Sequence, residues 1–155
     1  MEAFKFSMPT EVMMGVGRYD EVGEHCARLG QKVLLHYGGG SIKRSGVLDR
    51  IKASLDAAGL EVFELGGVEP NPRVDLVREG IALCKAEGID VILAAGGGSV
   101  IDSAKGIAAG VKIEDDIWDA YLGKVALADA LPIGVVLTIP AAGSECSDVS
   151  VVTKR

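Results

Sequence analysis

A short apolar run that leads into three glycines and a serine is the feature that most constrains how this chain folds. Residues 91–95 are all apolar, glycines occupy 96–98, and Ser99 opens an amphipathic segment. This order predicts a buried strand, a tight turn and the N-terminus of a helix, where Ser99 would cap the helix or contact a ligand. Backbone N–H groups and the positive end of the helix dipole converge at such a turn, which suits a phosphate group. We expect anion binding there, and the alternative is a strand-to-helix turn without a ligand.

Strand-like and helix-like segments alternate along the rest of the chain. The patterns predict strands at 32–37, 60–65, 90–95, 132–140 and 149–153, helices at 19–29, 42–58, 74–88 and 99–110, a short helix at 115–122 and an extended piece near 4–6. Apolar strands separated by helices predict an α/β fold, here a Rossmann-like, doubly wound parallel sheet with helices on both faces. Ligands of such sheets bind at the carboxyl ends of the strands, where Ser99 would lie.

The length and charge of the chain narrow its class. With 155 residues and no linker, it is predicted to be a single nucleotide-binding domain that spans 1–155. A net charge of −6, with no basic cluster beyond Lys43 and Arg44, argues against a nucleic-acid partner. No apolar run reaches the ~18 residues that cross a bilayer, and the first residues lack the layout of a signal peptide. We therefore expect no membrane partner and a cytoplasmic location.

The chain has only three cysteines and two histidines. Cys26, Cys84 and Cys146 are widely spaced and odd in number, which argues against a disulfide framework and a zinc knuckle. The first two fall among apolar residues and are expected in the core, whereas Cys146 is expected in a loop and not as a reactive thiol. With only His25 and His36 available, no histidine-based metal site is expected within this chain.

A second glycine cluster follows the strand predicted at 32–37. Gly38 to Gly40 and Ser41 again connect a strand end to a helix, and Lys43 and Arg44 follow at once. In doubly wound nucleotide folds an acidic residue near such a position usually holds the ribose hydroxyls of NAD. Here glycine, serine and two cations replace it, and they would accept the 2′-phosphate of NADP. The alternative is a solvated basic pair on the first turn of a helix, where the helix dipole slightly disfavours it.

The third feature is a loop of small and hydroxyl residues at 138–148, after the strand predicted at 132–140. Small side chains let a ligand lie against the backbone, and hydroxyls offer adaptable hydrogen bonds. Ser144 is not expected to be a nucleophile, because no Gly-x-Ser-x-Gly elbow surrounds it. Asp102 lies three residues after Ser99 and would either face the ligand or act as a first-turn carboxylate paired with Lys105 on the surface.

These features in this order resemble the iron-containing (group III) alcohol dehydrogenase family, and especially its NADPH-dependent butanol dehydrogenase and aldehyde reductase branch. The likeness is carried by Glu-Pro-Asn-Pro at 69–72, Gly-Gly-Gly-Ser-Val-Ile-Asp-Ser-Ala-Lys at 96–105 and Leu-Thr-Ile-Pro-Ala-Ala-Gly-Ser-Glu at 137–145. Tyr-Gly-Gly-Gly-Ser at 37–41 resembles the NADP-using branch, because NAD-using relatives tend to carry an aspartate near Gly38. Glycerol dehydrogenase and dehydroquinate synthase share the architecture and remain to be excluded.

The resemblance implies a role for individual residues. Those implied to bind the cofactor are Gly97, Gly98 and Ser99 at the pyrophosphate, Gly38, Gly39 and Ser41 at the 2′-phosphate, Asn71, Thr138, Ser147 and Val149 along the adenine, ribose and nicotinamide, and Asp102 near the nicotinamide and the substrate. Asp102 is accordingly the single candidate for a catalytic position.

The resemblance also implies a reaction and a missing part. Family members reduce small aldehydes to primary alcohols with NADP(H), and a helical domain after the nucleotide-binding domain supplies an aspartate and three histidines to Fe²⁺ or Zn²⁺. This chain ends at Arg155 before any such ligand, so we expect no metal ligand in it and binding of cofactor without turnover. An exposed apolar face would then favour self-association or contact with the missing helical domain. The alternative is a non-catalytic nucleotide-binding or assembly module.

Overall fold

Four parallel strands form the centre of the protein. A computed structural model describes residues 8–154, so the extended piece expected near 4–6 lies outside the described residues. The strands are β1 (Lys32–Gly38), β2 (Glu61–Val68), β3 (Val91–Gly96) and β4 (Ile133–Leu137), in the spatial order β2-β1-β3-β4. All neighbouring pairs are parallel. The carboxyl ends of the four strands therefore lie at one edge of the sheet, and the four strands predicted between 32 and 140 are confirmed.

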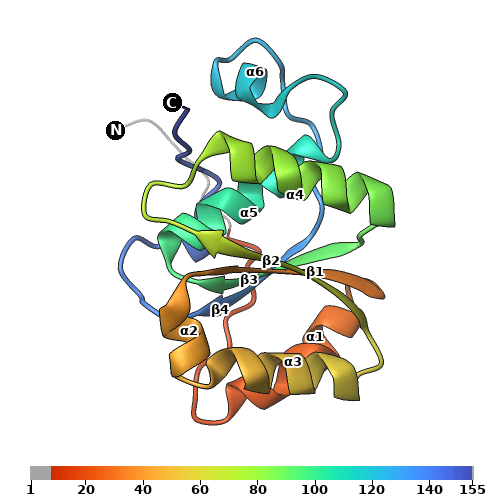
Figure 1. Ribbon diagram of the computed structural model, residues 1–155, viewed down its shortest axis with the longest axis vertical. Helices are drawn as coiled ribbons and strands as arrows, with labels where there is room; N and C mark the ends of the chain where they lie inside the picture. The colour runs from red at the N-terminus through yellow and green to blue at the C-terminus, as the bar shows by residue number, and fades with distance from the viewer. Residues whose placement is uncertain (1–7, 155) are drawn as a thin grey trace.

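Helices cover both faces of this sheet (Figure 1). One layer holds α1 (Val22–Ala27), α2 (Gly40–Arg44) and α3 (Val47–Ala57), preceded by a 3₁₀ turn η1 (Arg18–Glu21). The other layer holds α4 (Val74–Glu87), α5 (Gly98–Gly110) and the short α6 (Ile117–Tyr121), and a second 3₁₀ turn, η2 (Ser144–Cys146), follows β4. The predicted doubly wound α/β fold is confirmed.

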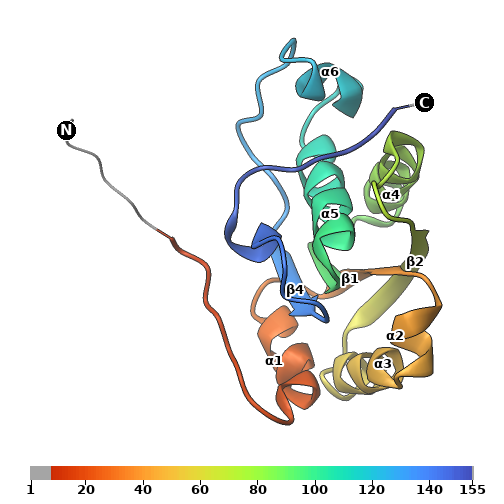
Figure 2. The ribbon, with the colours of Figure 1, turned by 90° about the vertical axis from the view of Figure 1, so that its left-hand side faces the viewer.

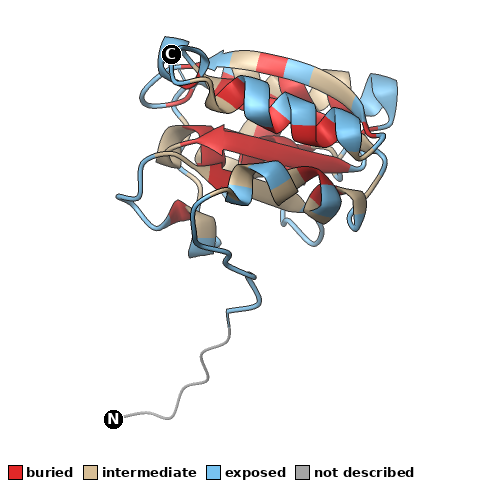
Figure 3. Cartoon of the chain, turned by 90° about the horizontal axis from the view of Figure 1, so that it is seen from below, coloured by how far each residue is buried: buried red, intermediate tan, exposed pale blue. Residues whose placement is uncertain are grey.

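The two central strands are buried on both sides, as Figure 3 shows. Every residue of β3 is buried, and so are residues 33–37 of β1. Because helices cover both faces, the buried residues of these strands are apolar, with His36 of β1 as the polar exception, which explains the apolar runs in the sequence. Cys26 and Cys84 belong to the two cores as expected, and burial raises the pKa of their thiols to about 11 and about 12. Cys146 is exposed in η2, as expected for a loop residue.

The helix predicted at 42–58 is two helices. It breaks at Ser45 and Gly46, where Gly46 adopts a left-handed φ of 74° and the Ser45 hydroxyl donates to the carbonyl oxygen of Ile42 at 3.1 Å. A glycine at positive φ ends a helix at little cost, and this local signal outweighs the continuous apolar periodicity. Lys43 and Arg44 consequently lie in the last turn of α2, which the helix dipole favours, and not in a first turn.

The strand predicted at 149–153 is wrong. Only Thr153 pairs, with Arg73, in an isolated parallel bridge, in which the Thr153 N–H donates to Pro72 at 2.8 Å and the Val74 N–H donates to Thr153 at 3.0 Å. The segment after η2 crosses α5 on its way to the start of α4, so it runs over a helix and not beside a strand (Figure 2). Across residues 8–154, no helix is long and apolar enough to span a bilayer.

Candidate functional site: two glycine loops at the carboxyl edge of the sheet

The loop between β3 and α5 is built around glycines that serve different purposes. A Cβ on Gly96 would lie 2.5 Å from the Val100 side chain, so packing explains that glycine. A Cβ on Gly97 would meet nothing closer than 3.8 Å and one on Gly98 nothing closer than 3.5 Å, and neither residue has positive φ. The chain alone therefore does not require glycine at Gly97 or Gly98. Two residues without side chains at a helix N-terminus allow a phosphate group to approach the backbone closely.

Ser99 does not cap α5, which was one of its two predicted roles. The N-cap of α5 is Gly97, with no side-chain cap hydrogen bond, and Ser99 lies inside the first turn. The Val100 and Ile101 N–H groups donate to the carbonyl oxygen of Gly97 at 3.0 and 3.2 Å. In an α-helix the earlier N–H groups have no carbonyl four residues behind them, so those of Gly98 and Ser99 can donate to a ligand. Capping by Ser99 is thus wrong, whereas its predicted contact with a ligand stays a prediction.

The loop between β1 and α2 lies next to the first one. The Val100 methyl that a Cβ on Gly96 would touch would also lie 3.5 Å from a Cβ on Gly38. Gly39 has a negative φ of −82°, and nothing lies within 4 Å of a Cβ placed on it. Packing therefore leaves room for a side chain at Gly39, although its ψ of −147° lies outside the extended and helical regions. Ser41 is exposed beside it, in the first turn of α2.

Cations dominate the outer side of the β1–α2 loop. The Lys43 ammonium lies 5.4 Å from the centre of the Tyr37 ring, and a Cβ on Gly40 would lie 2.6 Å from a nitrogen of the Arg44 guanidinium. The neighbouring carboxylate, Glu64, accepts from the Tyr37 hydroxyl at 3.0 Å and from Lys52. The Lys52 hydrogen bond lowers the pKa of Glu64 in spite of its partial burial. Glu64 is therefore ionised, but its charge is balanced by Lys52. Lys43 and Arg44 then give the surroundings of the loop a net positive charge.

The loop after β4 lies over the β3–α5 loop. The Thr138 N–H donates to the carbonyl oxygen of Gly96 at 3.0 Å and extends the ladder by one residue. Beyond it, Ile139 and Ala142 are the groups nearest to the positions of a Cβ on Gly97 and Gly98. The structure thus brings the predicted residues Thr138, Gly97 and Gly98 together, with Ile139 and Ala142 nearest to the bare glycines.

Asp102 is engaged by the segment that follows this loop. The Ser144 hydroxyl donates to Asp102 Oδ1 at 2.6 Å, and the Val151 N–H donates to Oδ2 at 3.2 Å. The Ser150 hydroxyl donates to the Asp102 carbonyl oxygen at 2.8 Å. Asp102 therefore fastens residues 144–151 to α5. Both alternatives drawn from the sequence, a group facing the ligand and a surface partner of Lys105, overlooked this role.

Lys105 also contacts the same segment. Its ammonium donates to Ser144 Oγ at 3.1 Å and to the carbonyl oxygen of Val149 at 2.8 Å, and no ion pair joins it to Asp102 within residues 8–154. Burial lowers the pKa of Lys105. Lys105, which was expected only on the surface, thus holds the backbone of the predicted site residue Val149 against α5.

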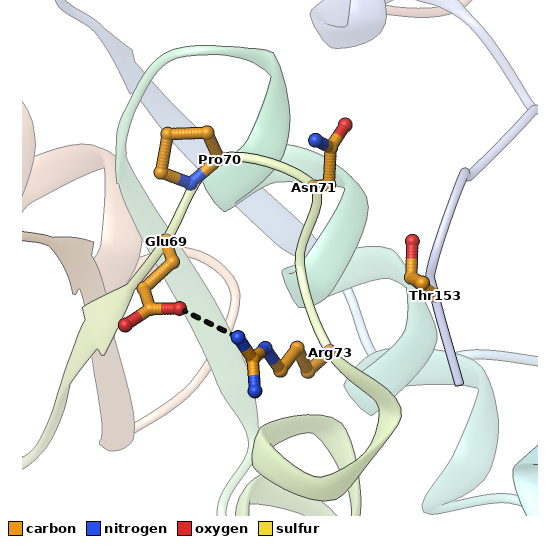
Figure 4. A pocket seen from close by; sticks show the side chains of 5 residues that line it. All are labelled: Glu69, Pro70, Asn71, Arg73 and Thr153. Atoms are coloured by element: carbon orange, nitrogen blue, oxygen red, sulfur yellow. Dashed lines mark ion pairs between the residues drawn. The ribbon is translucent and has the colours of Figure 1, made fainter. Parts of the chain in front are cut away.

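Ser147, Val149 and Asn71 lie at the margins of the site. Ser147 and Val149 are exposed, and the Ser147 hydroxyl accepts from the Val149 N–H at 3.0 Å. Asn71, with a left-handed φ of 58°, follows β2 and lines a pocket of about 480 Å³ with Glu69, Pro70, Arg73 and Thr153. Figure 4 shows the Asn71 amide pointing away from the Glu69–Arg73 ion pair, whose atoms are 3.4 Å apart. The amide is thus available to a ligand at the carboxyl edge.

Sequence reasoning missed several residues that hold this arrangement. The Tyr121 hydroxyl, from α6, lies 2.7 Å from Ser150 Oγ, and burial raises the pKa of Tyr121. His36 contacts Ser103 on α5 from inside the sheet. These pairs are separated by 29 and 67 positions, so no local pattern in the chain could have indicated them.

A metal does not fit the residues that the structure describes. From Met8 to Lys154, no three His, Cys, Asp or Glu side chains gather where they could hold an ion.

Comparisons with known proteins agree with the fold. A model of the family described as iron-containing alcohol dehydrogenase matches residues 9–155. The chain is 50% identical over 153 residues to the probable NADH-dependent butanol dehydrogenase 2 of Bacillus subtilis, covering 99% of this chain and 39% of that protein. It is 37% identical over 161 residues to the NADPH-dependent aldehyde reductase YqhD of Escherichia coli, covering 100% of this chain and 40% of that protein.

A solved structure gives the same result in three dimensions. The crystal structure of NADH-dependent butanol dehydrogenase A from Thermotoga maritima matches with a TM-score of 0.96 and 46% identity, covering 99% of this chain and 39% of that one. The chain thus spans about two fifths of the length of these relatives, whose names divide between NADH and NADPH. Fold, glycine loops and sequence identity lead to one conclusion: the chain belongs to the iron-containing alcohol dehydrogenase family.

Proposed function

We propose that residues 1–155 form one domain that binds NADP(H) for a metal-dependent alcohol dehydrogenase, which interconverts small aldehydes and primary alcohols by hydride transfer. One observation carries the cofactor site: Gly97 and Gly98 keep bare backbone at the carboxyl edge of the sheet, although neither their backbone conformation nor packing requires glycine there. In this proposal Gly97, Gly98 and Ser99 hold the pyrophosphate. The reaction and substrate class rest on the relatives, which are named as butanol dehydrogenases and an aldehyde reductase.

The preference for NADP over NAD rests on charge at the β1–α2 loop. Gly38, Gly39 and Ser41 occupy the place where an acidic side chain would hold the ribose hydroxyls of NAD. Lys43 and Arg44 follow this loop in α2, and the nearby carboxylate of Glu64 is held by Lys52 and Tyr37. A 2′-phosphate would meet positive charge there, and two charge-assisted contacts favour it.

Calorimetric titration with NADPH and NADH tests this preference. We expect tighter binding of NADPH, and we expect Ser41→Asp to weaken NADPH at least about tenfold while changing NADH by less than about threefold, because a carboxylate repels only the extra phosphate. The control is Ala53→Asp, which adds the same charge on the exposed side of α3 and should leave both affinities unchanged. Equal affinities in the wild-type chain, or equal loss in Ser41→Asp, would contradict the 2′-phosphate site.

Binding without turnover is the second part of the proposal. Hydride transfer to an aldehyde needs a group that polarises the carbonyl oxygen, which in this family is supplied by a bound divalent metal. We expect no oxidation of NADPH by the 155-residue chain with butanal, with or without added Fe²⁺ or Zn²⁺, measured by absorbance of the reduced nicotinamide. Turnover that depends on either metal would overturn this part.

We also propose that an exposed apolar surface drives self-association or contact with further helices of the same enzyme. Leu122, Leu127, Val149 and Val151 are each more than half exposed. We expect the chain to form dimers or larger species in light scattering and to bind a hydrophobic dye, because exposed apolar area favours association.

The matched variants separate this surface from the rest of the protein. Leu127→Ser with Val151→Ser should reduce both association and dye fluorescence. Leu29→Ser, which changes an exposed leucine just beyond α1, should not. A monomer without dye binding in the wild-type chain would refute this surface as a docking face.

A further inference from the structure

His36 is a fully buried ionisable side chain that the proposed function does not use. It lies in β1, and its exposed fraction is 0%. Nδ1 lies 2.8 Å from the carbonyl oxygen of Leu65 in β2, and Nε2 lies 2.8 Å from Ser103 Oγ in α5. A carbonyl oxygen only accepts, so Nδ1 carries the proton. The ring is then neutral, and the Ser103 hydroxyl donates a hydrogen bond to Nε2.

The Leu65 contact lies where the sheet is irregular. His36 pairs with Leu65 and Gly38 pairs with Val68, so the register of β1 and β2 shifts between these pairs. Two glycines, Gly66 and Gly67, fill the bulge, and Gly67 has a left-handed φ of 92°. A bulge interrupts the ladder and leaves backbone groups in need of partners. The His36 imidazole supplies a partner for the carbonyl oxygen of Leu65, and through Ser103 it connects the bulge to α5.

The Ser103 contact joins the two elements that carry the glycine loops. His36 precedes Gly38 by two residues on β1, and Ser103 follows Ser99 by one helical turn on α5. Ser103 is itself fully buried. The hydrogen bond between them therefore links the strand before one loop to the helix after the other, close to both.

We propose that His36 and Ser103 are positioning residues that set the spacing of the two phosphate-binding loops. This inference rests on the proposed function. A dinucleotide must reach both loops at once, so its affinity depends on their relative placement. A ligand that uses only the β1–α2 loop does not depend on that placement.

The test compares a ligand that spans both loops with one that spans a single loop. NADPH is the first, and adenosine 2′,5′-bisphosphate is the second, measured by calorimetry and by displacement of NADPH fluorescence. Ser103→Ala is expected to weaken NADPH about tenfold, the equivalent of one lost buried hydrogen bond, and to change the bisphosphate less than about twofold. His36→Asn keeps a donor for Leu65 but is too short to reach Ser103, so it should match Ser103→Ala.

Ser54→Ala is the matched control. Ser54 is 9% exposed on the opposite layer, where its hydroxyl donates to the Asp20 carbonyl oxygen at 2.8 Å and accepts from the Gly23 N–H at 2.9 Å. Its loss should lower stability without changing the ratio of the two affinities. That ratio is therefore a measure that a merely structural role would not move.

The outcomes separate the inference from the proposed function. Selective loss of NADPH in both Ser103→Ala and His36→Asn supports the positioning role. Equal loss of both ligands, no loss of either, or the same ratio change in Ser54→Ala overturns it while the cofactor site stands. Failure of the wild-type chain to bind NADPH overturns the proposed function and the inference with it, and failure of the bisphosphate to displace NADPH overturns the two-loop placement.

Discussion

Gly98→Ala is expected to remove most of the affinity for NADPH while leaving the chain as stable as before. The added methyl would meet only ordinary contacts, the nearest being Ala142 at 3.5 Å. Alanine is also the better helix former, so the free energy of unfolding should stay level or rise by up to about 1 kcal/mol. The same methyl would occupy the space that a phosphate oxygen needs, and we expect at least a tenfold loss of affinity, about 1.4 kcal/mol or more. Gly97→Ala should weaken NADPH in the same way, but its stability should not rise, because Gly97 is the N-cap of α5 and alanine is disfavoured there.

The neighbouring glycine supplies the contrast. Gly96→Ala would place a methyl 2.5 Å from the Val100 side chain, which must then shift. Overpacking of this kind costs about 1–3 kcal/mol, so this variant should unfold at lower denaturant concentration. Calorimetric titration and denaturant unfolding of the three variants give both quantities. If Gly98→Ala binds NADPH as the wild type does, the β3–α5 loop is a turn and not a phosphate site.

Acidification is expected to destabilise the protein between pH 6.5 and 4 through one histidine. Burial lowers the pKa of His36 from its ordinary 6.5 to about 4, against the smaller opposing effect of its hydrogen bond to Leu65. In this window the unfolded chain binds a proton that the folded chain excludes, so the free energy of unfolding falls as the pH falls. The full contribution is about 3 kcal/mol, and it levels off below pH 4.

Denaturant unfolding of the wild type and of His36→Asn over this range measures the effect. The variant lacks the titrating ring, so the difference in stability between the two proteins should shrink by about 3 kcal/mol from pH 7 to pH 4. Carboxylates with lowered pKa values, such as Asp90, titrate in both proteins and cancel. Parallel stability curves would show that His36 is protonated without cost and is not held neutral.

The strands of the sheet could be predicted well because a buried strand appears in the sequence as a run of apolar residues. β1 and β3 are covered on both faces, so their buried positions are apolar except for His36, and the chain shows this as apolar runs. The glycine loops could also be predicted, because the glycines are consecutive and directly follow a strand-like segment. The same reasoning failed at 149–153. The apolar residues Val149, Val151 and Val152 are typical of a strand, but their pairing partner is decided by where the chain passes.

The sequence by itself determined the family, the alternation of strands and helices, and the positions of Gly38, Gly39, Gly96, Gly97 and Gly98 at strand-to-helix junctions. Only the tertiary structure decided which of these glycines the chain itself needs, because that depends on atoms such as the Val100 methyl. It also decided that Asp102 and Lys105 bind residues 144–151, and that His36 reaches Ser103. The physical reason is that a hydrogen bond between side chains depends on distance in space, whereas sequence patterns record only periodicity and burial within one element.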